Sequence, residues 1–197
     1  MRRVWGLANR GATSYWPTMV FVNSDAVAPE VVRPPAQQAA ALDADRDLEL
    51  VLNFLNTCDV EAGTDVLDDP EHWRRWCAER GLGAAPESTA AREIRYSMRA
   101  AISCSAPAAL VAPAWQVQVE FRAGIPVLTG ADALGDVLVA ATHLVHTGYW
   151  DRIKICPAEN CLWAFYDRSR NRSRTWCSMR VCGNREKARS WRERHSG

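Results

Sequence analysis

Four cysteines near the C-terminal end of the chain have the residue type and the spacing of metal ligands. The pattern is Cys156-x4-Cys161, fifteen intervening residues, and Cys177-x4-Cys182. A structural zinc ion takes four thiolate or imidazole ligands in a tetrahedron, and two close pairs separated by a loop supply them. The pattern therefore predicts one structural Zn²⁺ per chain, with no open position for a catalytic water. Two buried reduced pairs, or redox disulfides, are the alternative.

The segment that carries these cysteines has little apolar material for a core, and a bound metal is a reasonable substitute for one. We expect a hairpin between the two pairs, with Trp163 and Phe165 on its strands and residues 168–174 at its tip. A helix is expected after Cys182. Each cysteine pair is expected to form a metal-binding turn, or zinc knuckle. The order of knuckle, hairpin, second knuckle and helix predicts a small treble-clef-like module over residues 151–197. The short connection before it favours an independent unit.

Charge is distributed unevenly, although the formal net charge of the chain is only +1. Residues 1–150 hold 12 Arg and 18 Asp or Glu, a net charge of −6, whereas residues 151–197 carry +7. A basic segment on an acidic body binds an anionic partner such as nucleic acid, docks on its own body, or is simply a solvated basic surface. The first interpretation makes the basic side chains of the tail candidate nucleic-acid contacts. These are Arg168, Arg170, Arg172, Arg174, Arg185, Lys187, Arg189 and Arg192.

Upstream of the tail, residues 44–150 have the pattern of a mostly helical domain. Apolar periodicity and capping residues predict four helices, beginning near Asp45, Pro70, Glu87 and Asp132. Strict alternation over residues 115–129 predicts a β-hairpin, with Pro126 on an edge strand. The expected fold class is therefore α+β, a helical domain with one hairpin followed by the zinc module.

Residues 1–43 contain several Pro and Gly residues and lack a stable period, so we expect a flexible N-terminal segment. Met19 is an alternative start, which would leave residues 1–18 outside the native protein. The two arginines near the start are not followed by the apolar run of a signal peptide. No stretch approaches the roughly 18 apolar residues that span a bilayer. We therefore expect a cytoplasmic protein with reduced thiols and no membrane partner.

Two short runs resemble known families. The run CSMRVCGNR from Cys177 to Arg185 resembles the signature of the CGNR zinc-finger family. The run LNFLNT from Leu52 to Thr57 resembles the ABATE domain that is usually fused to it, although that domain has Asp where this chain has Asn53. The resemblance implies a bacterial, stress-related transcription regulator, and it implies no established enzyme activity.

Three functions remain open at this point. The leading hypothesis is a DNA-binding regulator whose N-terminal domain is a sensor or an oligomerisation unit, with a homodimer as one arrangement. The second is a small-molecule or haem-binding enzyme with a structural zinc annex; the sequence has no catalytic triad, phosphate loop or dinucleotide fingerprint. The third is an RNA-binding or protein-docking adaptor. Candidate groups for a small-molecule ligand are Asn53, Asn56 and Arg99.

Overall fold

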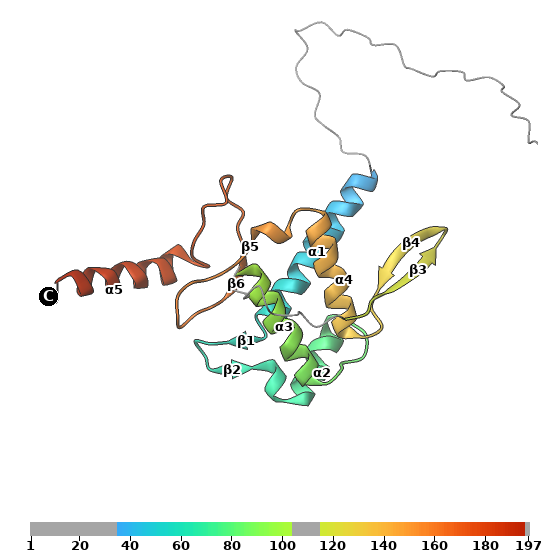
Figure 1. The fold of residues 1–197 in the computed structure, drawn as a ribbon, viewed down its shortest axis with the longest axis horizontal. Helices are drawn as coiled ribbons and strands as arrows, with labels where there is room; N and C mark the ends of the chain where they lie inside the picture. Colours follow the sequence, from blue (N-terminus) through green and yellow to red (C-terminus); the bar gives the residue numbers. More distant parts are fainter. Residues whose placement is uncertain (1–34, 104–114, 196–197) are drawn as a thin grey trace, which may run out of the picture. The chain divides into compact units, whose positions relative to one another are not determined.

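The computed structural model describes residues 35–103 and 115–195, with side chains from residue 43 onward (Figure 1). The chain from Pro34 to Gly197 forms one compact unit. Most of the predicted flexible segment, residues 1–34, lies outside the described residues. The described chain combines helices with three small antiparallel strand pairs, which confirms the α+β class. Within these ranges no helix is both long and apolar enough to cross a membrane.

Four helices build the main core: α1 (Pro35–Leu55), α2 (Pro70–Glu79), α3 (Ser88–Ile102) and α4 (Ala133–His146). Helices α1 and α4 pack side by side along much of their length. The core formed by the four helices contains Phe54 of α1 and the stacked rings of Trp73 and Trp76 of α2, whose centroids lie 5.2 Å apart. The predicted starts of α2 and α4 are confirmed, and each helix is capped: Asp69 accepts from the N–H of Glu71, and Asp132 accepts from the N–H of Gly135.

The prediction that the first helix begins near Asp45 is wrong, because α1 begins at Pro35. The acidic residues at positions 45, 47 and 49 therefore lie in the middle of the helix and not in its first turn. Proline is preorganised for the first helical position, and the alanines and glutamines that follow it are good helix formers. A stretch without apolar periodicity can still form a helix when its composition favours one.

Short elements connect the helices. Strands β1 (Cys58–Asp59) and β2 (Thr64–Asp65) pair after α1, and a 3₁₀ turn (Val66–Asp68) leads into α2. Strands β3 (Gln118–Arg122) and β4 (Ile125–Thr129) form the predicted hairpin. Its two turn residues, Ala123 and Gly124, have φ angles of 51° and 81°, as a tight two-residue turn requires.

The C-terminal module follows a 3₁₀ turn (Trp150–Arg152). It contains strands β5 (Ile153–Ile155) and β6 (Ala164–Tyr166), a π-helical turn (Met179–Gly183) and helix α5 (Asn184–His195). The predicted hairpin between the cysteine pairs is wrong, because β5 and β6 flank the first pair and residues 168–174 form a loop. The first cysteine pair forms the turn of this hairpin. The arginine-rich stretch has no apolar side chains to pack as strands, and its backbone is held by polar groups instead.

Candidate zinc centre and nucleic-acid interface

The four predicted ligands meet at one point. Cys156 directly follows β5 and Cys161 precedes β6, while Cys177 precedes the π-helical turn that carries Cys182. Their sulfur atoms all lie within 4.8 Å of one another, and Cys177 Sγ lies 3.5 Å from Cys161 Sγ and 3.6 Å from Cys182 Sγ. A tetrahedron with Zn–S bonds of about 2.3 Å places its sulfurs about 3.8 Å apart. The cluster therefore fits one structural zinc ion.

Burial makes the thiols of Cys177 and Cys182 poor acids in the absence of a metal. It raises the pKa of Cys182 to about 11, and it raises the pKa of Cys177 still further. Burial also opposes ionisation of Cys156, but backbone N–H groups of Cys177 and Ala158 outweigh it and lower the pKa of that thiol. A divalent cation supplies the compensating charge that keeps all four groups as thiolates. Four protein ligands give the metal a structural role.

A buried carboxylate organises the loop after β6. Asp167 is completely buried, and its carboxylate accepts hydrogen bonds from Lys154 Nζ at 2.7 Å, Ser169 Oγ at 2.6 Å and the backbone N–H of Arg174 at 2.9 Å. Burial alone would raise the pKa of Asp167, but the hydrogen bonds from Lys154, Ser169 and Arg174 hold it well below its usual range. The carboxylate therefore stays charged and fixes both ends of residues 168–174, which we name the arginine loop.

Two cations complete the support of the arginine loop from the inside. Lys154 Nζ donates to the backbone carbonyls of Arg172 and Arg174, at 2.6 and 2.9 Å. Arg152 donates to the carbonyls of Asp167 and Ser169, at 3.2 and 3.0 Å. Three loop carbonyls, those of Ser169, Arg172 and Arg174, are therefore bound by side chains of the same module, which fixes the loop conformation. Asp167 and Lys154 were not predicted as site residues; the only sequence signal was an Asp directly after an apolar strand and before the arginine run.

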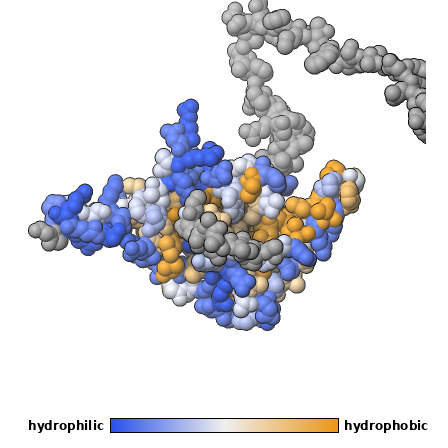
Figure 2. All heavy atoms as spheres, viewed as in Figure 1, coloured by the Kyte–Doolittle hydropathy of each residue, from blue (hydrophilic) through white to orange (hydrophobic). Residues whose placement is uncertain are grey.

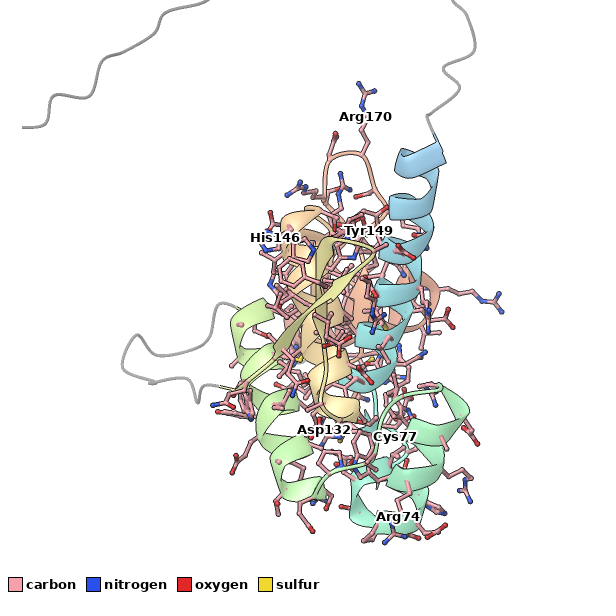
Figure 3. All side chains as sticks on the ribbon, turned by 90° about the vertical axis from the view of Figure 1, so that its right-hand side faces the viewer. Arg74, Cys77, Asp132, His146, Tyr149 and Arg170 are labelled. Carbon is pink, nitrogen blue, oxygen red and sulfur yellow. The ribbon has the colours of Figure 1, made fainter. Side chains whose placement is uncertain are left out.

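The arginines of the loop do not share one environment. Arg168, Arg170 and Arg172 are exposed, and Figure 3 shows Arg170 at the outer tip of the loop, pointing away from the ribbon. The guanidinium of Arg168 lies 5.8 Å from the ring of Tyr166. Arg174 folds back, donates to the carbonyls of Trp176 and Cys177, and covers the ring of Phe165 at 4.9 Å.

The basic residues of α5 that were predicted to contact nucleic acid also differ in their environments. Arg185 pairs with Glu61 of the N-terminal domain at 2.8 Å, and Arg189 is paired with Glu186 and Glu193 of its own helix. Lys187 and Arg192 are exposed. The carboxylate partners neutralise Arg185 and Arg189 locally, whereas in the arginine loop Arg168 and Arg170 are exposed and Arg172 lies 3.9 Å from the exposed carboxylate of Asp151.

The predicted ligand-binding residues separate into two places. Asn56 is committed to structure, because its side-chain amide donates to the carbonyl of Ala164 at 2.9 Å and accepts from the N–H of Ala164 at 2.7 Å. Arg99 is also committed, since it donates to the carbonyls of Leu55 and Leu162. Asn53 and Asn56 both line a groove of about 600 Å³ between α1 and β6, whereas Arg99 lies outside it.

This groove is the place where the two predicted domains meet. One wall carries Asp45, Glu49 and Asn53 at successive turns of α1, and the other carries aromatic side chains around β6, including Trp163 and Tyr166, together with Arg168. The main core also continues into the module, because Ile153 and Ala164 are buried in it. The expectation of an independent C-terminal unit is therefore wrong in this structure. Two residues of the helical domain bind the backbone at and just before β6, because Asn56 bonds to Ala164 and Arg99 donates to the carbonyl of Leu162.

Comparisons with known families agree with these features. The family model described as "Putative stress-induced transcription regulator" (ABATE) matches residues 48–153, and the model described as "CGNR zinc finger" matches residues 152–195. Both matches confirm the resemblances found in the sequence. None of the curated proteins compared with the chain matches it. The two matched ranges meet at the start of β5.

Proposed function

Because the chain belongs to the ABATE family, described as "Putative stress-induced transcription regulator", and ends in a CGNR zinc finger, we propose that it is a cytoplasmic transcription regulator that binds DNA through the arginine loop. The helical domain serves as the sensor or oligomerisation unit. The zinc ion has a structural role, since it ties the β5–β6 turn to the start of α5.

The observation that carries this proposal is the fixed arginine loop. Three exposed guanidinium groups, on Arg168, Arg170 and Arg172, project from a backbone that Asp167 and Lys154 hold from the inside. A fixed backbone lowers the entropy that is lost when these side chains bind a partner. Guanidinium groups match phosphate oxygens in geometry and charge. The net charge of −6 on residues 1–150 disfavours phosphate contacts elsewhere, so DNA is expected to meet the module first.

The salt dependence of DNA binding tests the number of phosphate contacts. With Lys187 and Arg192 added to the three exposed loop arginines, log affinity should fall with log salt at a slope of about −4 to −5, since each contact contributes about −0.9. The double variant R170A/R172A should weaken binding and flatten the slope by about 2. R189A is the matched control, because Arg189 is already paired with Glu186 and Glu193. Fluorescence anisotropy with a labelled duplex measures all three proteins.

Competition experiments separate a regulator from a general polyanion binder. At physiological salt, a promoter fragment should compete better than bulk DNA, structured RNA or heparin. Asn171 is exposed on the loop and is the candidate for reading a base edge, so N171A should relax the preference at one position while the salt slope is unchanged. Equal competition by heparin and by every genomic fragment would reject the DNA-regulator proposal, and a preference for RNA would favour the adaptor hypothesis.

A second role, as a small-molecule sensor, is favoured by the groove between α1 and β6. Asn53 and the carboxylates of Asp45 and Glu49 face the aromatic wall of Trp163 across this groove. A ligand bound there would contact both the helical domain and the base of the arginine loop. A metabolite panel in a thermal-shift assay tests this role: a stabilising compound should lose its effect in N53A. Stabilisation that persists in N53A would place that ligand elsewhere.

A further inference from the structure

The hairpin formed by β3 and β4 is exposed on almost its whole surface. All residues of β3 are exposed, and Phe121, Ile125 and Val119 retain 75%, 64% and 60% of their accessible surface. Figure 2 shows hydrophobic side chains gathered over this hairpin. A two-stranded hairpin alone is marginally stable in water, and a contiguous exposed apolar patch commonly marks a protein interface.

Val119, Phe121 and Leu128 lie on one face of the hairpin, whereas Ile125, which pairs with Arg122, lies on the other face. Residues directly opposite each other share a face, and the register pairs Val119 with Leu128 and Phe121 with Pro126. Glu120 and Arg122 lie on the other face, where their side chains form an ion pair at 3.2 Å. The half-buried residues of β4, Val127 and Thr129, also lie on that second face.

The two edges of the hairpin are not equivalent. Pro126 has no N–H, so the outer edge of β4 is a poor template for another strand. Strand β3 contains no proline. Because a two-residue turn joins Arg122 to Ile125, these flanking residues form a hydrogen-bonded pair. The backbone groups of Val119 and Phe121 then point outward to the other edge of β3, which pairs with no further strand in the described part of the chain.

We propose that β3 pairs in antiparallel orientation with β3 of a second copy of this chain, about a twofold axis at Phe121. In this register Glu120 of each copy lies directly opposite Arg122 of the other copy. A register centred on Glu120 would place two glutamates opposite each other, which is destabilising. The sequence of the strand is therefore electrostatically self-complementary in one register, and an isologous contact of this kind closes as a dimer.

Pairing at this edge joins two hairpins into a four-stranded sheet. The two Phe121 rings become cross-strand neighbours, and the apolar faces of both hairpins become continuous. The contact is small, so the dimer is expected to depend on concentration. The β3 edge is then the surface through which the helical domain would oligomerise, as proposed above. This pairing does not depend on whether the arginine loop binds DNA.

Charge exchange at positions 120 and 122 tests the pairing. Sedimentation velocity over a concentration series should show a monomer–dimer equilibrium for the wild-type protein. E120R puts Arg opposite Arg122 and R122E puts Glu opposite Glu120, so each variant alone should be monomeric. Mixed in equal amounts, the two variants should form a heterodimer, because every opposing pair is then of opposite charge. The double variant E120R/R122E should form a homodimer again.

A charge change away from the hairpin is the control for the variants at positions 120 and 122. R74E makes the same charge change as R122E at an exposed position on α2, and it should not alter the sedimentation of the protein. A wild-type monomer at the highest soluble concentration would overturn the proposal, and so would single variants that dimerise as the wild type does or a mixture that fails to associate. A monomer that still binds DNA would refute this pairing alone and leave the DNA-binding proposal intact.

Discussion

The buried carboxylate of Asp167 forms an ion pair with the half-buried Lys154 at the base of the arginine loop, with Lys154 Nζ 2.7 Å from Asp167 Oδ2. The two residues come from opposite strands of the β5–β6 hairpin, Lys154 from within β5 and Asp167 from the position after β6. Because both also bind the backbone of the loop, this single pair connects the zinc-bearing hairpin to the exposed arginines.

The D167N variant should loosen the arginine loop without removing the zinc. The neutral amide cannot balance the charge of Lys154. Its NH₂ group would also replace a carboxylate oxygen that accepts hydrogen bonds, so that one donor would face another donor. We expect a lower melting temperature, faster proteolysis within residues 168–174 and weaker DNA binding. Zinc content should remain at one per chain. D151N is the control, because Asp151 is exposed and lies 3.9 Å from Arg172. A loop as protease-resistant in D167N as in the wild type would contradict this role.

Zinc binding should require the four clustered cysteines and no other cysteine that the structure describes. C177S should lose the metal and unfold α5 and its π-helical turn, since binding at such sites is worth about 10–16 kcal/mol in small zinc modules. The core of α1–α4 should remain folded, as judged by the near-ultraviolet circular dichroism of its tryptophans. C58S should keep one zinc, because Cys58 lies outside the cluster. Full zinc content in the C156S/C177S variant would refute the assignment.

The ion pair between Arg95 and Asp65 should be important for the stability of the helical domain. Arg95 is buried on α3 and makes two hydrogen bonds to the Asp65 carboxylate, at 2.7 and 2.5 Å. R95A leaves that carboxylate unpaired in a largely buried site, which typically costs about 3–5 kcal/mol. Urea denaturation measures the loss. The double variant D65L/R95M should recover much of the lost free energy of unfolding. If R95A and the double variant lose the same amount, the loss comes from altered side-chain packing and not from the unpaired carboxylate.

The same pair predicts how stability depends on pH. Burial alone raises the pKa of Asp65, but the hydrogen bonds from Arg95 and from the N–H of Leu67 lower it below its usual value. A carboxyl with a depressed folded-state pKa stabilises the fold above its unfolded pKa of about 3.9 and loses that contribution as pH falls through the folded value. The free energy of unfolding should therefore fall below about pH 4, and it should fall less in D65N. Parallel pH curves for the two proteins would contradict this account.

Asn56 should determine how tightly the zinc module is attached to the helical domain. Its amide makes both a donor and an acceptor contact with the backbone of Ala164, which replaces the pairing that a neighbouring strand would supply. N56A should cost about 1–3 kcal/mol because two backbone groups are left without partners. Hydrogen exchange at the amide of Ala164 should accelerate. N53A is the matched control one helical turn away. Similar hydrogen exchange in both variants would argue against a role of Asn56 in attaching the zinc module to the helical domain.

The sequence by itself determined those features that depend on neighbours along the chain. Asp69 before Pro70 and Asp132 before an apolar run identified helix starts, because a capping side chain acts within three residues. The alternation of residues 115–129 identified the β3–β4 hairpin. The two cysteine pairs identified the zinc ligands, since their spacing and residue type are sufficient for a tetrahedral site.

Only the tertiary structure decided which side chains remain available for binding. Arg185 is paired with Glu61, and Asn56 is bound to Ala164, across separations of 124 and 108 residues. No local pattern signals such partners, because their proximity depends on how the β5–β6 hairpin packs against α1. For the same reason Asp167 resembled any other acidic residue in the sequence. Its burial beneath the arginine loop, opposite Lys154, makes it the residue that positions the candidate DNA contacts.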